Sequence, residues 1–319
     1  MPKIGIVYGM ESSFPYAVVD SINGKRIPGV LAEHIRLGGI RMAEPSGYAV
    51  IIDRISHAIE FYRAYLKNAA LGGTAVINNS FWWSADDKFF NYSLASKLGI
   101  AVPRTAILPQ KMHPPGTTVQ SMRNLKFPLD WEEVFDYVGF PAFLKPLSGG
   151  AWKHHYEVGS PREFFEAYDQ TGSMCMSLQA TVNFEECFRC YVVGREKVRV
   201  MRYDPKQPHH LRYAGTGQTI EPSLHDRMVN DALMLCRTLG YDLNAVEFAV
   251  ENGVPYAIDL LDPAPDADVH SIGKENFEWI VENVAQMAIA QALEPERRPA
   301  SFRWEHFLKS KAASSNNGD

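Results

Sequence analysis

The chain has 319 residues, with 32 Lys and Arg against 37 Asp and Glu, so its formal net charge is −5. Hydrophobic residues at 46% and charged residues at 22% are ordinary globular values and exclude a disordered chain. The negative balance argues against a nucleic-acid partner, and no run of about 18 apolar residues predicts a membrane span. Four cysteines are too few for a disulfide scaffold, so we expect a reducing, cytoplasmic location.

The first 80 residues alternate strand-like and helix-like segments. Strands are predicted at residues 4–8, 48–53 and 74–78. A helix is predicted at residues 57–68, where apolar residues recur at helical spacing. This alternation is typical of a parallel, Rossmann-like sheet. No G-x-G-x-x-G follows the first strand, so a dinucleotide site is not expected there.

A further helix is predicted to begin at Ser84, because Asp87 follows three residues later in a capping-box-like pattern, and to stop at Gly99. Residues 100–108 favour an extended segment. Residues 109–127 contain Pro, Gly, Met and Lys without periodicity, which is typical of a long connection or linker.

The remainder favours mixed helices and strands. Helices are predicted at 131–138, from the signature Ser160-Pro161-Arg162-Glu163 onward, at 223–239 ending at Gly240, and at 274–293. Strands are predicted at 142–145, 174–182, 188–193 and 198–203, and a hairpin at 245–250 and 254–260. Residues 314–319 are predicted to be a frayed tail. Strands therefore dominate residues 174–203.

Cys187 and Cys190 form a C-x-x-C, the spacing of redox pairs. A redox pair needs this spacing at a helix N-terminus, whereas here it lies within a predicted strand. Side chains alternate between the two faces of a strand, so an offset of three separates the sulfurs. We therefore expect structural cysteines, with Arg189 on the face of Cys187 and Tyr191.

Two pairs of adjacent histidines, His154-His155 and His209-His210, raise the question of a metal site. Adjacent residues do not converge on a strand or helix, and no H-E-x-x-H or matching carboxylate spacing accompanies them. Exposed loop positions or substrate contacts are therefore favoured.

A lysine lies in the apolar segment Phe143-Leu144-Lys145. Burying a lysine is costly unless it meets an anion. The loop that follows contains Ser148, Gly149 and Gly150, and glycines let backbone N–H groups approach phosphate oxygens. The G-x-x-x-x-G-K-[ST] of a P-loop is absent. Taken alone, Lys145 is equally compatible with a surface lysine whose stem lies along the strand.

Glu247 and Asp259 lie on the two strands of the late hairpin, and Asp262 follows. Carboxylates this close together favour a bound cation. The alternative is that Glu247 faces solvent and Asp262 begins a turn. A two-residue loop would leave Glu247 and Asp259 on opposite faces, whereas a three-residue loop ending in Gly253 would pair Glu247 with Ala257 and align both acids. We expect the three-residue loop.

Short segments recur in a recognisable order between about residues 45 and 290. They are Ala75–Asn78, Asp87-Lys88, Gly99–Thr105, Gly139–Pro146, Phe188–Gly194, Val246–Phe248 and Ile258-Asp259. Their order and spacing together resemble the ATP-grasp superfamily, and the most similar branch is that of RimK-type amino-acid ligases and related glutathione-synthase-like enzymes. The resemblance implies that ATP and Mg²⁺ are the cofactors.

The resemblance also implies roles for residues at matching positions. The implied ATP-binding residues are Lys88 and Lys145 at the phosphates, Ser148, Gly149 and Gly150 in the loop over them, Gln179, Ala180, Thr181 and Val182 in the adenine hinge, and Glu185 or Glu186 at the ribose. Arg189 and Arg202 would stabilise the transferring phosphoryl group or the acyl phosphate. Glu247, Asp259 and Asp262 would hold magnesium. In this family the N-terminal domain usually shapes the acceptor site, where Asp53, Arg54, Trp82 and Trp83 are candidates; burial at a domain junction is the alternative for the tryptophans.

The chain departs from the family at two places. The usual metal motif is Glu-x-Asn, whereas this chain has Asp259-Leu260-Leu261-Asp262, so Asp262 matches the Asn only if one residue is inserted. Ala180 stands where a Glu is usual. These departures keep open a second hypothesis, a module that binds ATP without catalysis, and a third, an ATP-grasp kinase acting on a small molecule.

The expected fold class is α/β, with a Rossmann-like N-terminal domain (residues 1–108) followed by the two α+β subdomains of an ATP-grasp fold (109–185 and 186–298) and a tail (299–319). The expected function is ATP-dependent ligation of a carboxylate to an amine through an acyl phosphate, with release of ADP. The expected partners are small-molecule or peptide carboxylates and amines, with no nucleic acid and no membrane. Whether the chain forms a homo-oligomer is left open.

Overall fold

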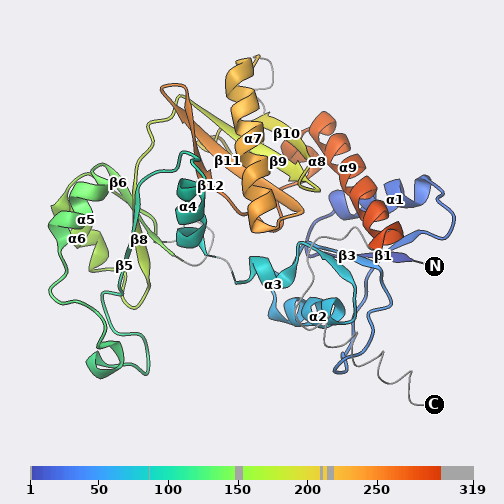
Figure 1. The fold of residues 1–319 in the computed structure, drawn as a ribbon, viewed down its shortest axis with the longest axis horizontal. Helices are drawn as coiled ribbons and strands as arrows, with labels where there is room; N and C mark the ends of the chain where they lie inside the picture. The colour runs from blue at the N-terminus through green and yellow to red at the C-terminus, as the bar shows by residue number, and fades with distance from the viewer. Residues whose placement is uncertain (1, 86, 148–153, 209–210, 214–218, 296–319) are drawn as a thin grey trace.

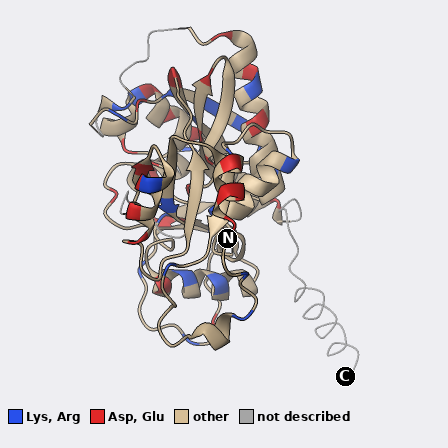
Figure 2. Cartoon of the chain, turned by 90° about the vertical axis from the view of Figure 1, so that its left-hand side faces the viewer, with Lys and Arg blue, Asp and Glu red and all other residues tan. Residues whose placement is uncertain are grey.

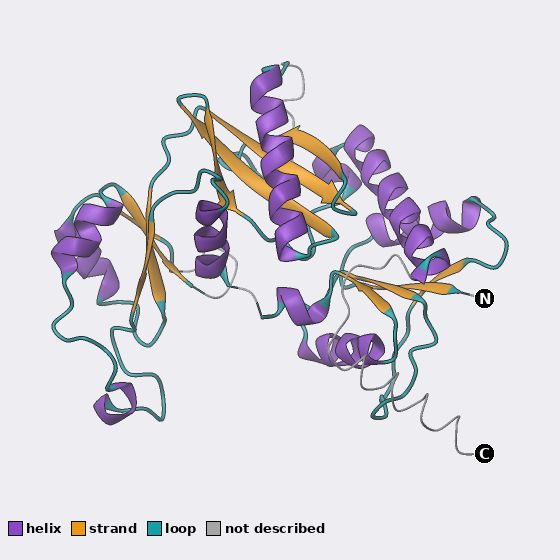
Figure 3. Ribbon diagram, in the orientation of Figure 1, coloured by secondary structure: helices purple, strands orange, loops and turns teal. Residues whose placement is uncertain are grey.

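The computed structural model describes residues 2–85, 87–147, 154–208, 211–213 and 219–295. Their strands form three four-stranded sheets (Figures 1 and 3). In Figure 1 the N-terminal sheet lies at the right, a middle sheet at the left, and a third sheet between them at the top. One sheet is parallel and two are antiparallel, and helices pack on their faces, so the fold belongs to the predicted α/β class.

The N-terminal sheet is parallel throughout, as its alternating pattern predicts. Its order is β2 (Leu31–His34), β1 (Lys3–Val7), β3 (Val50–Asp53) and β4 (Ala75–Ile77). The connecting helices are α1 (Phe14–Gly24) and α2 (Glu60–Leu71). The last helix of the described chain, α9 (Lys274–Leu293), packs against α1 and also contacts β1 and β3. The two ends of the described chain therefore meet on one face of this sheet.

The middle sheet is antiparallel, in the order β5 (Thr105–Leu108), β8 (Met176–Ala180), β6 (Ala142–Pro146) and β7 (Tyr156–Val158). Helices α5 (Trp131–Val138) and α6 (Pro161–Tyr168) contact it, and a short 3₁₀ helix, Val119–Met122, lies in the connection before α5. Because β5 pairs with β8, the middle sheet begins before the boundary predicted at residue 108.

The third sheet is also antiparallel, in the order β10 (Lys197–Arg202), β9 (Glu186–Val193), β11 (Leu243–Glu251) and β12 (Val254–Asp259). Helix α7 (Pro222–Leu239) and α9 both contact β9 and β10. The helices α3 (Ser80–Trp83) and α4 (Lys88–Lys97) lead from the N-terminal sheet toward the middle sheet, and α8 (Val269–Ile272) precedes α9.

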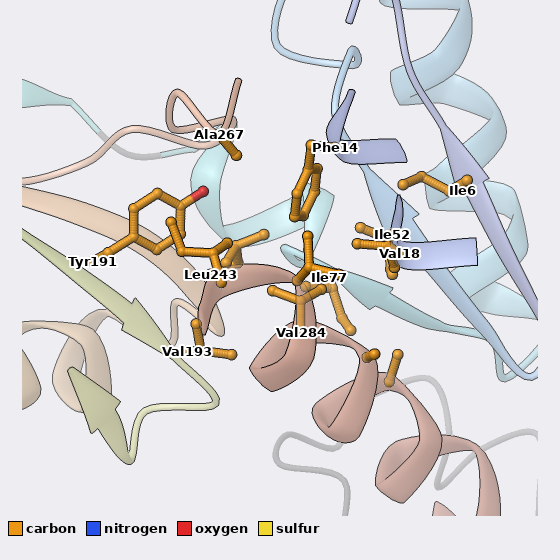
Figure 4. Packing of buried hydrophobic residues seen from close by; sticks show 14 of the residues in the cluster. Ile6, Phe14, Val18, Ile52, Ile77, Tyr191, Val193, Leu243, Ala267 and Val284 are labelled. Atoms are coloured by element: carbon orange, nitrogen blue, oxygen red, sulfur yellow. The ribbon is translucent and has the colours of Figure 1, made fainter. Parts of the chain in front are cut away.

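The N-terminal and third sheets share one hydrophobic core. Ile6, Phe14 and Ile52 from the first sheet and its helix pack in one cluster with Tyr191 and Leu243 from the third (Figure 4). A second cluster joins the other face of the third sheet to α4 and α7. We call this continuous unit, from the N-terminal sheet to the third sheet with α4, α7 and α9, the body.

The middle sheet has a separate core. Leu144, Phe164 and Leu178 are fully buried there with partners drawn from residues 106–180 alone. The cluster includes closely spaced aromatic rings, among them Trp131 and Phe164 with centroids 5.3 Å apart. We call the middle sheet with α5 and α6 the middle lobe.

The cysteine prediction is confirmed. Cys187 and Cys190 lie on β9, and their buried side chains belong to different clusters on opposite faces of the third sheet. Both are free thiols, and burial raises the pKa of each. Protonated, separated thiols do not form a redox pair.

The start of α4 differs from the prediction. Asp87, not Ser84, caps this helix: its carboxylate accepts a hydrogen bond from the Phe90 N–H at 2.7 Å. Ser84 instead ends the short helix α3, where its hydroxyl donates to the Ser80 carbonyl. Asp and Ser are about equally good caps, so residue type alone did not distinguish the two candidates.

Acidic and basic residues are interspersed along the elements (Figure 2). No helix among the described residues has both the length and the apolarity needed to cross a membrane.

Candidate functional site

Lys145 lies where the middle lobe faces the body. It is the fourth residue of β6, and its ammonium donates to the Gln179 Oε1 at 2.7 Å and lies 3.4 Å from the Tyr92 hydroxyl. The ammonium is also 5.3 Å from the centroid of the Tyr92 ring. Burial, with repulsion from Lys88, lowers the pKa of Lys145 to about 8. A lysine held this way is poised to gain from an arriving anion.

Lys145 contacts β8 and α4, and a further strand supports each of these contacts. Gln179 comes from β8, and its amide donates to Thr105 on β5 at 2.8 Å. Tyr92 comes from α4, whose first residue is Lys88, and its hydroxyl donates to the Ile258 carbonyl on β12. The structure therefore brings the two predicted phosphate lysines near the strand that ends in Asp259.

A second cluster lies on β9 and β11. The Arg189 guanidinium pairs with the Glu247 carboxylate, donates to the Tyr213 hydroxyl at 2.7 Å and stacks 4.5 Å from the centroid of the Tyr203 ring. Burial raises the pKa of Glu247; Asp259 adds to this effect and Arg189 opposes it. Arg189 is thus held rigidly, with its charge directed at the carboxylates.

The hairpin register confirms the alignment of Glu247 with Asp259 but not the predicted reason. Glu251 pairs with Val254, so the loop has two residues, Asn252 and Gly253, both with positive φ. A β-bulge then shifts the register: Phe248 pairs with Ala257, while Glu247 pairs with Asp259. The predicted three-residue loop, and the predicted pairing of Glu247 with Ala257, are wrong. One extra residue on β12, Ile258, restores the alignment.

Asp262 is fixed by the loop that carries it. Its backbone N–H donates to the Asn244 Oδ1 at 2.9 Å, and its carboxylate accepts from the Ala264 N–H at 3.2 Å. Burial raises the pKa of Asp262, against the influence of Arg189. Within the described ranges, however, no three or more His, Cys, Asp and Glu side chains are grouped closely enough to hold a metal ion. Glu247, Asp259 and Asp262 are therefore electrostatic neighbours without forming a three-ligand cage.

Arg202 and Glu186, both predicted site residues, are ion-paired with each other, and the Arg202 guanidinium lies 5.1 Å from the centroid of the Phe188 ring. A cavity of about 570 Å³ lies beside this pair. Its wall includes Arg199, Arg202, Tyr213, His270, Ser271 and Asn276. Because Tyr213 also contacts Arg189, the cavity adjoins the Arg189–Glu247 cluster.

The segment predicted as the adenine hinge spans the last two residues of β8 and the two residues that follow it. The N–H groups of Ala180 and Thr181 donate to the carbonyls of Arg104 and Pro141, at 2.9 and 3.1 Å. The Val182 N–H has no acceptor among the residues that the structure describes. Among the contacts of the described residues, Val182 is therefore the hinge residue whose N–H has no acceptor. Glu185 is exposed, and its N–H donates to the Val250 carbonyl at 2.9 Å.

The predicted phosphate loop lies outside the described residues, since Ser148, Gly149 and Gly150 fall there, as do His209 and His210. Of the other histidine pair, His154 is exposed and His155 half-buried.

The N-terminal candidates divide between buried and exposed positions. Asp53 accepts two backbone N–H groups, from Ile55 and Ser56, at 3.0 and 2.9 Å. Arg54 is buried against Glu11 and donates to the Pro265 carbonyl at 2.7 Å. Trp83 is buried, whereas Trp82 is half exposed. Asp53, Arg54 and Trp83 therefore have structural contacts, and Trp82 remains open to solvent.

Sequence reasoning missed Tyr92 and Tyr213. A tyrosine in a helix, or in the segment after a strand, is typical of a residue that packs in the hydrophobic core. Only tertiary contact shows that one hydroxyl meets Lys145 and the other meets Arg189. A signal was available for Tyr92 alone: it is one helical turn from Lys88, at a spacing of four residues.

The structure resembles solved ATP-grasp enzymes over nearly its whole length. A RimK-domain ATP-grasp protein from Sphaerobacter thermophilus is 14% identical, with a TM-score of 0.60 over 90% of this chain and 99% of that one. D-alanine–D-alanine ligase from Bacillus anthracis, solved with ATP, is 14% identical, with a TM-score of 0.63 over 95% of this chain and 100% of that one. The ATP-grasp ligase PsnB, solved with a minimal precursor, is 15% identical, with a TM-score of 0.60 over 91% of this chain and 100% of that one.

No protein-family model and no curated protein matches the sequence. Identities near 14% carry the fold and not the substrate. The order of the three sheets and the similarity to these structures agree with one another. The chain has the ATP-grasp fold.

Proposed function

We propose that this protein is an ATP-dependent carboxylate–amine ligase that forms an amide or peptide bond through an acyl phosphate and releases ADP. The observation that carries the proposal is the convergence of Lys145, Lys88 and Arg189 on the strand pair bearing Glu247 and Asp259. A carboxylate is a poor electrophile until its oxygen becomes a good leaving group, and phosphorylation achieves this. Cations held in fixed places stabilise the charge that develops.

ATP would lie between the middle lobe and the body. Its adenine would meet the hinge of Gln179 to Val182, with the Val182 N–H as a donor. Its phosphates would meet Lys88 and Lys145, under the loop of Ser148, Gly149 and Gly150. Glu186 would meet the ribose in preference to Glu185, because it is half-buried at the start of β9.

The carboxylates fit magnesium. Glu247 and Asp259 offer oxygen ligands from paired positions on adjacent strands. Asp262 lies close enough to repel Glu247, so ionising these carboxylates without a bound cation is unfavourable. Magnesium usually takes one or two protein carboxylates and completes its shell with phosphate oxygens and water, so a three-ligand protein cage is not required. When bound, it neutralises charge on the phosphates. Arg189 would then be shared between Glu247 and the transferring phosphoryl group.

The substrates would enter beside the Arg189–Glu247 cluster. The cavity beside Arg202 and Tyr213 adjoins the Arg189 cluster and is large enough for an amino acid or the end of a peptide. The parallel N-terminal sheet, which we propose is the Rossmann-like domain of this family, would close the remaining side. The named neighbours act on D-alanine or bind a precursor peptide, so small-molecule and peptide substrates both belong in the search.

The test is a screen of amino acids and short peptides as pairs of acid and amine, with ADP formation and product mass as readouts. The proposal predicts ADP and phosphate, and a product joined with loss of water, only when acid and amine are both present. Release of AMP would contradict the acyl-phosphate route. A phosphorylated product that persists without an amine would identify a small-molecule kinase instead.

A second candidate, a module that binds ATP without catalysis, is favoured by one observation. The Asp259-to-Asp262 segment departs from the Glu-x-Asn metal motif of the family. Such a module would bind ATP tightly and yield no ADP across the whole screen. The two candidates therefore separate in the same experiment.

A further inference from the structure

Tyr92 contacts both halves of the site. It lies on α4, within the body, and is 5% exposed. Its hydroxyl donates to the Ile258 carbonyl and lies 3.4 Å from the Lys145 ammonium, which approaches from the middle lobe. Among the described contacts of Lys145, Gln179 is on the lysine's own lobe, so Tyr92 provides the link to the body.

The carbonyl that Tyr92 holds belongs to the β-bulge. Ile258 is the extra residue of β12 between the pairs Glu247–Asp259 and Phe248–Ala257. The extra residue of a bulge lacks a partner across the strand, so another donor must stabilise it. Because this bulge sets Glu247 opposite Asp259, the Tyr92 hydroxyl fixes the residue on which the alignment of the carboxylates depends.

The charges around Lys145 explain why a neutral group is needed. Lys88 faces it from α4 and repels it, Asp259 faces it from β12 and attracts it, and Gln179 on β8 is neutral. Burial, Asp259 and Glu247 raise the pKa of Tyr92, so its hydroxyl keeps its proton. It can therefore donate to Ile258 while its oxygen accepts from Lys145.

We propose that Tyr92 is a positioning residue that holds the Lys145 ammonium at a fixed distance from the bulge of β12, and so sets the spacing between the phosphate-binding lysine and the carboxylate pair. This inference rests on the proposed binding of ATP. The aromatic ring serves packing, and the hydroxyl serves positioning. A phenylalanine would fill the same space and lose only the positioning.

The chain offers a matched control. Tyr241 is buried in the same hydrophobic cluster as Tyr92, and its hydroxyl has no hydrogen-bond partner within the described part of the chain. Tyr241→Phe removes a hydroxyl from that core without removing a contact to the site. The two variants therefore make similar changes to the packing of the core, but only Tyr92→Phe removes a hydroxyl that contacts Lys145 and Ile258.

The experiment is calorimetric titration of the full chain with Mg²⁺ and a non-hydrolysable ATP analogue between pH 6.5 and 9.5. Tyr92→Phe is expected to weaken binding about threefold to tenfold at pH 7, the effect of one hydrogen bond. Loss of the acceptor disfavours the charged form of Lys145. The affinity of the parent protein is expected to fall as pH rises past the pKa of Lys145, which burial lowers to about 8, and this point should move downward in Tyr92→Phe. Tyr241→Phe should change neither quantity.

Parent-like affinity and an unchanged pH profile in Tyr92→Phe would overturn the inference. So would equal shifts in the two variants, because loosened packing would then explain both. Failure of the parent protein itself to bind the analogue would overturn the proposed nucleotide site, and the inference with it. That outcome is distinct, since it appears before any variant is made.

Discussion

The middle lobe and the body are stabilised in different ways. The body is stabilised by residues from both ends of the described chain, so that Ile4 and Val284 belong to one cluster. The middle lobe is stabilised by residues near one another in sequence, all between 106 and 180. A local core can open without the rest, whereas a core that joins distant segments opens only as a whole. The candidate site lies where the separate lobe meets the continuous body.

The polar groups reflect the same difference. The body carries Arg189, Glu247 and Asp262, which are held by ion pairs and by hydrogen bonds to the backbone. The middle lobe contributes Lys145 and Gln179, and Lys145 meets the body at Tyr92. The body therefore supplies a rigid charged surface, and the middle lobe supplies a lysine whose placement depends on how the two parts meet.

The largest expected effect separates the two cores. Phe164→Ala removes a fully buried ring from the middle lobe and should cost about 3–5 kcal/mol of local stability. In hydrogen exchange, protection should fall in β6, β7 and β8 and remain in β9 and β11. The matched variant Phe14→Ala should lower protection in the N-terminal and third sheets together. Equal losses in all three sheets for Phe164→Ala would contradict the separation.

The next effect concerns the Arg189–Glu247 pair. Arg189→Met leaves Glu247 half-buried without its partner and should cost about 2–4 kcal/mol, somewhat less than for a fully buried pair. The pKa of Glu247 is raised by burial and should rise further. A carboxyl with a raised folded pKa favours folding at low pH and loses that stability as pH rises through the folded pKa.

Denaturant unfolding at pH 5 and pH 8 measures this effect. The Arg189→Met variant should be less destabilised at pH 5, and the double variant Arg189→Met, Glu247→Gln should recover much of the loss at pH 8. A loss independent of pH would show that Arg189 acts through packing on Tyr203 and not through its charge.

Lys145→Met tests the contribution of the middle lobe to nucleotide binding. ATP affinity should fall by about 1.5–3 kcal/mol, the scale of a charge-assisted hydrogen bond, while stability is kept because methionine retains the stem. The control is Lys197→Met, whose ammonium contacts Asn283 and Gln286 instead of the site. Calorimetry with ATP checks both variants. Unchanged affinity in Lys145→Met would contradict the placement of Lys145 at the phosphates.

The smallest effect on binding is expected at Arg202. Arg202→Ala should reduce kcat at least about tenfold while the KM for ATP stays within about threefold, because the proposed partner of Arg202 is the acyl phosphate. Steady-state kinetics on the ligase substrates provide the measurement. A rise in KM without a change in kcat would assign Arg202 to the ribose side, where it orders Glu186.

Local signals in the sequence predicted many of the helices and strands, whereas α1, β2, α3 and β7 were not predicted. The start of α6 at Pro161 and the end of α7 at Gly240 follow from cap chemistry that needs no tertiary contact. The membership of β5 in the middle sheet did not follow, because strand partners are chosen by long-range packing. The predicted break at residue 108 followed a change in composition, whereas the sheet begins earlier.

The candidate site was predicted only in part, because some of its contacts depend on long-range packing. Lys145 stands out because a charge in an apolar strand requires a partner. Glu247 stands out because neighbouring carboxylates favour a cation, and Arg189 was proposed from the family resemblance alone. The alignment of Glu247 with Asp259 depends on a bulge at Ile258, which no turn rule contains. The hydroxyl of Tyr92, which supports that bulge, looks like core in the sequence. Bulges and buried hydroxyls are set by the neighbouring element, so they appear only in the folded chain.

The central claim is that ATP binds across the middle lobe and the body together. Hydrogen exchange of the full chain with and without Mg²⁺ and a non-hydrolysable ATP analogue tests it most directly. The account predicts added protection in β6 and β8 of the middle lobe and, at the same nucleotide concentration, in β11 and β12 of the body. Protection confined to one of the two parts, or absent from both, would contradict a nucleotide site built between them.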